Sequence, residues 1–175
     1  PNWDRSAGSM KLSLDGKKLY TASADVGQHP SFAIEIASGA VKQIAGNGTV
    51  GEFDLANDTL AITRDTLSSP AQLFVMDVHG GAERQITVNN TELLAKIAIG
   101  ESEQFNFTGA KGEKVHGFVV KPANFQEGKK YPVAFLIHGG PQGSFGNHFH
   151  YRWNPQTYAG QGFAVVMIDF HGSTG

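Results

Sequence analysis

An internal repeat is the feature that most constrains how this chain folds. The segment IEIASGAVKQI begins at residue 34 and MDVHGGAERQI begins at residue 76, so the two copies are offset by 42 residues. Each copy alternates apolar and polar residues into a glycine-containing turn and out again, which is the pattern of a β-hairpin. A second alternating pair precedes each copy and is broken by a turn signal, Asp15-Gly16 in the first unit and Asn57-Asp58 in the second. The pattern therefore predicts two hairpins in each repeat.

Four strands in a period of about 40–45 residues are typical of a propeller blade, whereas a helical solenoid would show a periodicity of about 3.6 residues. Residues 1–87 are therefore predicted to be all-β and to form the C-terminal blades of a β-propeller, with Gly39 and Gly81 in equivalent turns. The alternative is that two ordinary hairpins resemble one another by chance. Because at least about four blades are needed to close a propeller, we expect further blades before Pro1.

Composition excludes several classes of function. The 14 basic and 16 acidic residues give a net charge of −2, so neither nucleic acid nor an acidic membrane surface is an expected partner. The chain contains no cysteine, which excludes disulfides and thiolate metal sites but leaves cytoplasm, periplasm and secretion all open. No apolar run approaches the roughly 18 residues that span a bilayer.

The pattern changes after the second repeat. Residues 88–103 are predicted to be a linker, either a short helix or an extended connector. Residues 102–122 alternate around a Gly-Ala-Lys-Gly turn and predict another hairpin. Residues 131–137 and 163–170 are continuous apolar runs, which predict two strands of a parallel sheet buried on both faces.

A helix is predicted between these two strands. Asn154 is a suitable N-cap, Pro155 suits the first helical position, and the segment continues to Gly160. A strand, a helix and a second strand form a right-handed βαβ unit in nearly all proteins. We therefore expect the two strands to be adjacent and parallel.

The motif His-Gly-Gly-Pro at 138–141 follows the first of these strands, where an α/β-hydrolase places one half of its oxyanion hole. Acyl transfer puts negative charge on the former carbonyl oxygen, and backbone N–H groups aimed at that oxygen stabilise the charge. Glycine suits the position because it tolerates a positive φ and leaves room for the oxygen. The alternative is a glycine-rich turn with no chemical role.

The block YPVAFLIHGGPQGSFGNHFHYRWNPQTYAGQGFAVVMIDFHGSTG, residues 131–175, resembles the first βαβ unit of the hydrolase domain in the prolyl oligopeptidase family of serine peptidases. It is most similar to the acylaminoacyl-peptidase and dipeptidyl-peptidase-V branch, although many relatives have arginine where this chain has His171. The resemblance implies a mixed fold in which β-propeller blades precede the first strands of an α/β-hydrolase domain. Residues 104–175 would be the N-terminal part of that catalytic domain.

The resemblance also assigns roles to the motif. Gly140 would donate its backbone N–H to the oxyanion, Gly139 would shape the turn, and His138 would pack or form hydrogen bonds without acting as a base. The serine, aspartate and histidine of the triad would follow Gly175, so the 175 residues alone are expected to be inactive. The implied activity is hydrolysis of short peptides through an acyl-enzyme, with no cofactor and no metal, and homo-oligomerisation stays open.

Three other motifs invite a different interpretation. GNGTVG at 46–51 matches a dinucleotide-binding pattern, but alternating residues follow it where that site needs a helix, so a turn is predicted. His148 and His150 have the spacing of metal ligands, but no third ligand is identifiable in the sequence. HGSTG at 171–175 imitates a nucleophile elbow around Ser173, but histidine replaces its first glycine.

Four aromatic residues that follow the motif either line a substrate pocket or pack against the propeller, and packing is the favoured interpretation. They are Phe145, Phe149, Tyr151 and Trp153. Another expectation concerns the sheet, which would present an apolar edge around Val165, Val166 and Ile168.

Two other functions fit parts of the sequence. An esterase of the α/β-hydrolase fold would use the same oxyanion chemistry but would need no propeller, and the repeat argues against it. A non-catalytic propeller module that binds other proteins would not need the buried strands that end in His-Gly-Gly-Pro.

Overall fold

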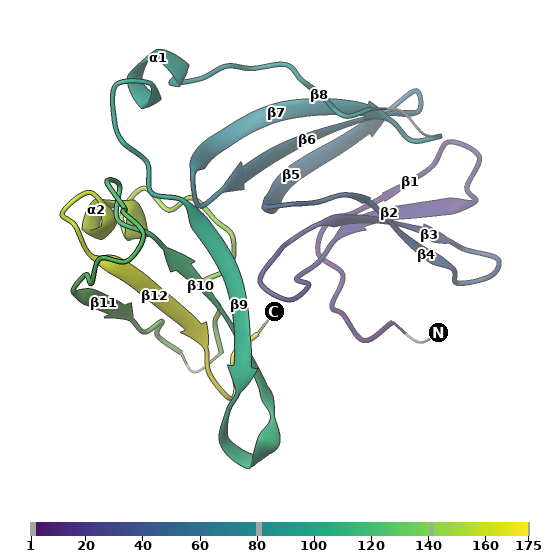
Figure 1. The fold of residues 1–175 in the computed structure, drawn as a ribbon. Coiled ribbons are helices and arrows are strands. Elements are labelled where there is room, and N and C mark those ends of the chain that lie inside the picture. Colours follow the sequence, from purple (N-terminus) through teal and green to yellow (C-terminus); the bar gives the residue numbers. More distant parts are fainter. Residues whose placement is uncertain (1–2, 80–81, 141, 175) are drawn as a thin grey trace.

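The computed structural model describes residues 3–79, 82–140 and 142–174, and it arranges them in three four-stranded sheets (Figure 1). The first two sheets follow chain order. The first contains β1 (Met10–Leu12), β2 (Lys18–Ala22), β3 (Ser31–Glu35) and β4 (Val41–Ala45). The second contains β5 (Thr49–Ala56), β6 (Thr59–Thr66), β7 (Ser69–Asp77) and β8 (Arg84–Gln85).

The two sheets reproduce the 42-residue repeat in their register. Phe32 of β3 pairs with Gln43 of β4, and Phe74 of β7 pairs with Gln85 of β8, each 42 residues further along. All neighbours within both sheets are antiparallel, as in a propeller blade. The prediction of two four-strand units is confirmed. Gly39 lies in the β3–β4 turn with φ 71°, whereas Gly81 is outside the described residues.

The predicted turn signals also form turns. Gly16 has φ 69° between β1 and β2, where the Ser13 hydroxyl donates to Asp15 and accepts from the backbone N–H of Lys18. Asn57 and Asp58 have φ values of 46° and 63° between β5 and β6. Two consecutive positive φ values characterise a type I′ hairpin turn, whose twist matches that of the strands.

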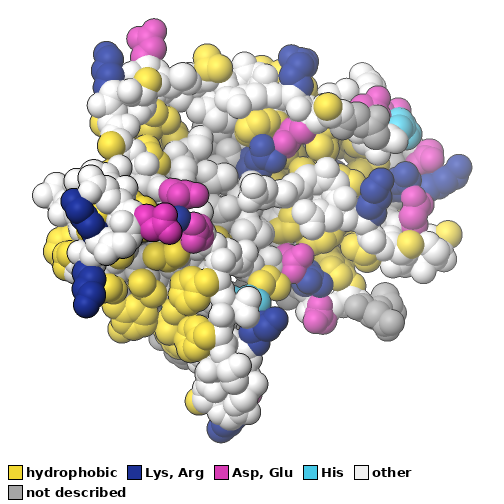
Figure 2. All heavy atoms as spheres, viewed as in Figure 1, with side chains coloured by type: hydrophobic (Ala, Val, Ile, Leu, Met, Phe, Trp, Pro, Cys, Tyr) yellow, Lys and Arg dark blue, Asp and Glu magenta, His cyan; other side chains and the backbone are white. Residues whose placement is uncertain are grey.

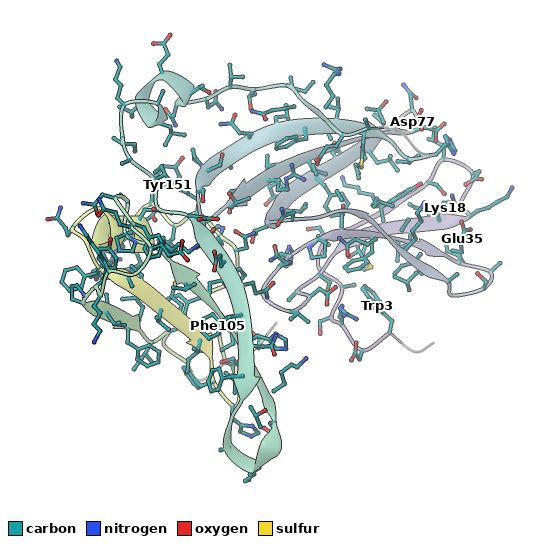
Figure 3. The ribbon with its side chains drawn as sticks, viewed as in Figure 1. Trp3, Lys18, Glu35, Asp77, Phe105 and Tyr151 are labelled. Carbon is teal, nitrogen blue, oxygen red and sulfur yellow. The ribbon has the colours of Figure 1, made fainter. Side chains whose placement is uncertain are left out.

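The first core lies between these two sheets and is apolar. Tyr20 of the first sheet and Leu60 and Ile62 of the second are at most 1% exposed. On the outer surface the strands carry charged pairs: Lys18 and Glu35 point toward one another across β2 and β3, with Nζ and Oε1 3.2 Å apart (Figure 3). Burial of the inner face therefore holds the sheets together, since an exposed pair such as this one contributes only about 0–1 kcal/mol.

The third sheet has the strand order β11-β12-β10-β9 and mixes antiparallel and parallel pairs. Its strands are β9 (Ser102–Thr108), β10 (Lys114–Val120), β11 (Val133–Leu136) and β12 (Ala164–Asp169). β9 and β10 form the predicted hairpin around the short 3₁₀ turn Ala110–Gly112. This hairpin projects from the body of the molecule (Figure 1).

The predicted βαβ unit is present. β11 and β12 pair in parallel, and α2 (Pro155–Ala159) connects them. The Asn154 side chain accepts a hydrogen bond from the backbone N–H of Gln156, and Pro155 is the first helical residue. The cap and the helix are therefore as predicted. α2 packs on one face of the sheet, where Ala159 and Val165 are fully buried.

Two expectations about burial are wrong. β11 lies at the edge of the sheet, and one of its faces is open: Val133 is 60% exposed and Phe135 is 49% exposed. The described residues place α2 on the other face only, so the apolar run is not buried on both sides. β12 is not an apolar edge, because it lies between β11 and β10, and its Val165 is fully buried. Hydrophobic side chains accordingly gather on the outer surface of this sheet (Figure 2).

The connection between the second and third sheets contains α1 (Thr91–Leu94), so the alternative of a short helix holds. α1 buries no residue, and β9 begins at Ser102, where the predicted hairpin begins. None of the described helices is long and apolar enough to cross a membrane.

Candidate active site: the turn after β11

The turn that follows β11 carries the two predicted oxyanion-hole residues, Gly139 and Gly140. Gly140 has φ 135°, and a Cβ built on it would lie 2.5 Å from the backbone nitrogen of Gln142, so the position requires glycine. Between described residues, no hydrogen bond uses the backbone N–H of Gly139 or Gly140. Pro141 of the motif is outside the described residues. The turn therefore presents two donors without an internal acceptor.

His138 fixes the start of the turn. Its ring stacks on Phe170 with centroids 4.3 Å apart and meets the edge of Phe145 at 5.6 Å. Nδ1 lies 2.8 Å from the carbonyl oxygen of Gly139, and Nε2 lies 2.8 Å from Oγ of Ser173. Because a carbonyl only accepts, Nδ1 carries a proton, and in the neutral ring Nε2 accepts from the Ser173 hydroxyl. The prediction that His138 packs and forms hydrogen bonds is confirmed.

Asp169 and Thr174, at and after the end of β12, form hydrogen bonds with residues 143–145, which follow the turn. The Asp169 carboxylate accepts hydrogen bonds from the Ser144 hydroxyl at 2.9 Å and from the Phe145 backbone N–H at 3.2 Å. The backbone N–H of Thr174 donates to the carbonyl of Gly143 at 2.9 Å. The glycine turn is thus held between two strands that are adjacent in the sheet.

Ser173, His138 and Asp169 form a cluster that sequence reasoning did not anticipate. Their arrangement is not that of a serine–histidine–aspartate triad, in which the two ring nitrogens face different partners, one the serine and the other the aspartate. Here Oδ1 of Asp169 lies 3.9 Å from Nε2, the nitrogen that also contacts Ser173, while Nδ1 faces the Gly139 carbonyl. No local motif signals this cluster, because His138 and Ser173 are 35 residues apart.

A cavity of about 550 Å³ lies beside the turn and is lined mostly by apolar side chains. Of the four aromatic residues, Phe145 and Trp153 line it, and Trp153 remains 62% exposed. Tyr151 is 77% exposed and contacts Phe149 at 5.2 Å between ring centroids. Neither packing nor pocket lining therefore describes all four residues.

The loop after the turn connects the third sheet to the first two. The buried side chain of Asn147 accepts from the backbone N–H of Leu67 at 2.9 Å and donates to the side chain of Gln28 at 3.1 Å. Next to it, Nδ1 of His148 lies 2.9 Å from the carboxylate of Asp65, which is 9% exposed. The hydrogen bond to Asp65 raises the pKa of His148 above its ordinary value, against the opposing effect of burial.

The structure excludes the dinucleotide interpretation of residues 46–51, because the strand β5 begins within them at Thr49, where that site needs a helix to follow. Nδ1 of His148 forms a hydrogen bond with the Asp65 carboxylate. Nδ1 of His150 accepts hydrogen bonds from the backbone N–H groups of Arg152 and Trp153, so both of these ring nitrogens have protein partners. Within the part of the chain that the structure describes, no three side chains are grouped to hold a metal ion.

Comparison with known proteins extends these observations. No family model matches the chain. It is 36% identical over 180 residues to the probable dipeptidyl-peptidase 5 of Aspergillus clavatus, an alignment that covers 99% of this chain and 25% of the fungal protein. Pyrococcus horikoshii acylaminoacyl peptidase matches its structure with a TM-score of 0.81 and 30% identity, over 98% of this chain and 26% of that one.

Over nearly all of its length the chain is similar to peptidases of the prolyl oligopeptidase family. A second family structure, an acylaminoacyl peptidase in complex with Z-Gly-Gly-Phe-chloromethyl ketone, matches with a TM-score of 0.83 and 29% identity over 99% of this chain and 26% of that one. The resemblance read from residues 131–175 is therefore confirmed. The chain spans about a quarter of the length of the family members it matches, all of which are named as peptidases.

Proposed function

We propose that this protein is a serine-type peptidase that hydrolyses short peptides through an acyl-enzyme, releasing dipeptides or acylated amino acids. In this proposal residues 1–87 belong to a β-propeller, residues 88–103 are the linker, and residues 104–175 begin an α/β-hydrolase domain. The relatives named dipeptidyl-peptidase 5 and acylaminoacyl peptidase support the substrate class.

The observation that carries the proposal is the geometry of Gly140. It follows a strand that is parallel to its neighbour, its φ of 135° requires glycine, and no described residue accepts its N–H. A substrate carbonyl placed over this turn would meet donors that are already oriented. Such donors stabilise the oxyanion of the tetrahedral intermediate without reorganising, and each contributes about 3 kcal/mol.

The cavity beside the turn suits the substrate side of this reaction. Its volume of about 550 Å³ and its apolar lining would take an uncharged side chain next to the scissile bond. The nucleophile is proposed to lie outside these 175 residues. The geometry around Ser173 supports this, because the His138 ring that contacts its hydroxyl has a carbonyl and not a carboxylate at its other nitrogen.

The proposal is tested with a fluorophosphonate probe and chromogenic substrates of three kinds: dipeptidyl amides, acyl-aminoacyl amides and simple esters. The full-length protein that carries this chain is expected to label stoichiometrically and to cleave the peptide substrates. The 175-residue chain is expected to do neither. Turnover of the esters alone would contradict a peptidase and favour an esterase.

A further inference from the structure

The loop from Ser144 to Phe149 separates two cavities. Ser144, Phe145 and His148 line both the cavity of about 550 Å³ beside the turn and a second one of about 270 Å³. The second cavity is otherwise lined mostly by residues of the first two sheets and their loops, among them Gln28 and Thr49. Movement of this loop would therefore connect the space beside the first two sheets with the space at the Gly139–Gly140 turn.

Apart from Phe145, which packs against the apolar core that contains Val165, the contacts that hold this loop in place are polar and span the sheets. The backbone of Asn147 donates to the carbonyl of Gly27 at 2.7 Å and accepts from the hydroxyl of Thr49 at 3.1 Å. Its side chain bonds the backbone of Leu67 and the side chain of Gln28. Each of these hydrogen bonds replaces hydrogen bonds to water, so it stabilises the closed loop by a net of only about 1 kcal/mol. A polar contact of this kind therefore opens more readily than an apolar core.

Asp65 at the end of β6 is the charged centre of this contact. Its carboxylate is 9% exposed and receives two donors from the loop: Nδ1 of His148 at 2.9 Å and the backbone N–H of Phe149 at 2.8 Å. The His148 side chain is 44% exposed, so solvent can reach it. From this geometry we propose that the Asp65–His148 pair is a pH-sensitive latch, which keeps the loop from Ser144 to Phe149 closed between the two cavities while His148 is protonated.

The other titratable groups around His148 are few among the described residues. His150 lies on the same loop with its ring centroid 6.2 Å away, and its Nδ1 already accepts two backbone N–H groups. His29 faces His148 across the smaller cavity, and its Nδ1 lies 2.8 Å from the carbonyl of Val50. His138 and Tyr158 line the larger cavity with His148. Asp65 is the carboxylate that the structure places in direct contact with the ring.

The direction of the pH dependence follows from the pair. Because Asp65 raises the pKa of His148 above the ordinary value of 6.5, the stabilisation is fully present below that pH and is lost as the pH rises through the raised pKa. Above it the neutral ring still donates an N–H to the Asp65 carboxylate, but the attraction between a positive ring and the negative carboxylate is lost. Each pH unit by which the closed-state pKa exceeds the open-state pKa makes opening about tenfold more frequent at high pH.

The test measures hydrogen exchange of the latch amides in the full-length protein that carries this chain. Three backbone N–H groups form hydrogen bonds between the loop and the first two sheets, and these bonds break when the loop opens. They are those of Leu67, Asn147 and Phe149. After correction for the intrinsic pH dependence of exchange, their opening constants are expected to be at least about threefold larger at pH 8.5 than at pH 5.5. Equal opening constants at the two pH values would overturn the proposal.

Variants separate the latch from general effects of pH. His148→Gln keeps a side-chain donor but cannot be charged, so its opening constants are expected to show no pH step. His171→Gln is the matched control, because His171 also contacts a carboxylate, Glu113, at 2.6 Å but is 78% exposed and away from the loop. It is expected to keep the step, and a step that survived in His148→Gln would contradict the latch.

A second measurement covers the case in which a variant does not fold. The ring of His148 is titrated by NMR in the unaltered protein, and its pKa is expected to lie above 6.5. A pKa at or below that value would also overturn the proposal. Neither measurement requires turnover, so a failure of the latch is distinguishable from a failure of the proposed peptidase activity.

Discussion

Replacing Gly140 with alanine perturbs the turn after β11, where we propose the oxyanion donors, at its tightest point. The new Cβ would lie 2.5 Å from the backbone nitrogen of Gln142 and 3.1 Å from its carbonyl carbon, and the residue would keep a φ of 135° that side chains with a Cβ rarely adopt. Both conflicts involve backbone, so the side chains cannot relieve them. The turn must therefore move, and the N–H of residue 140 moves with it.

Two magnitudes follow from this displacement. Strain at a positive φ costs about 1–3 kcal/mol, which is measured as a lower free energy of unfolding in urea. Loss of one oxyanion donor costs about 3–4 kcal/mol of transition-state stabilisation, which lowers kcat by about 10²–10³-fold. The donor acts on the oxyanion and not on the ground-state carbonyl, so KM is expected to change little.

The assay is steady-state hydrolysis of a dipeptidyl amide by the full-length protein, with active sites counted by fluorophosphonate labelling. Gly128→Ala is the matched control, because Gly128 also has a positive φ, 80°, but a Cβ there meets no atom within 4 Å. It is expected to lose about 1 kcal/mol of stability and to keep its kcat. A folded Gly140→Ala enzyme with a kcat within about threefold of the unaltered enzyme would refute the oxyanion role.

Two further predictions concern neighbouring contacts. Ser173→Ala removes one hydrogen bond to His138, so kcat is expected to fall by less than about tenfold and fluorophosphonate labelling to stay stoichiometric; complete loss of labelling would instead make Ser173 the nucleophile. Gln156→Ala leaves the backbone N–H of Gly100 without its acceptor at 2.8 Å and removes two donor contacts, to Gly100 and Leu67. The expected loss is about 1–3 kcal/mol of unfolding free energy in urea, and an unchanged urea midpoint would show that water replaces these contacts.

Local elements could be predicted because their causes are local. The Asn57-Asp58 turn, the Asn154 cap and the alternation in each hairpin all act over a few residues, and each appears in the structure where the pattern placed it. The repeat adds a longer-range constraint, because two copies of one pattern fold into two sheets with the same register. Those parts of the fold follow from the residues themselves.

Burial of the third sheet could not be predicted in the same way. The apolar run at 131–137 describes side chains, but exposure depends on which strands and helices lie beside them. The strand order β11-β12-β10-β9 puts Phe135 at an edge and Val165 inside, and nothing in either segment specifies that order. The pairing of β12 with β10 comes from a hairpin that precedes both parallel strands in the chain.

The candidate site shows the same division between local and distant causes. Glycine at 140 and histidine at 138 indicate a strained turn that a ring secures, and both roles could be inferred from the motif. The contacts that hold the following loop to the first two sheets join residues 80 to 120 positions apart, such as Leu67 with Asn147 and Gly27 with Asn147. The spacing of His148 and His150 resembles that of metal ligands, but the structure gives His148 a different partner. That partner is the carboxylate of Asp65, which lies on another sheet. The role of such a polar residue is therefore not evident from its neighbours in the sequence and depends on contacts between sheets. At such a contact, a change in one charge can alter how two parts of the molecule meet.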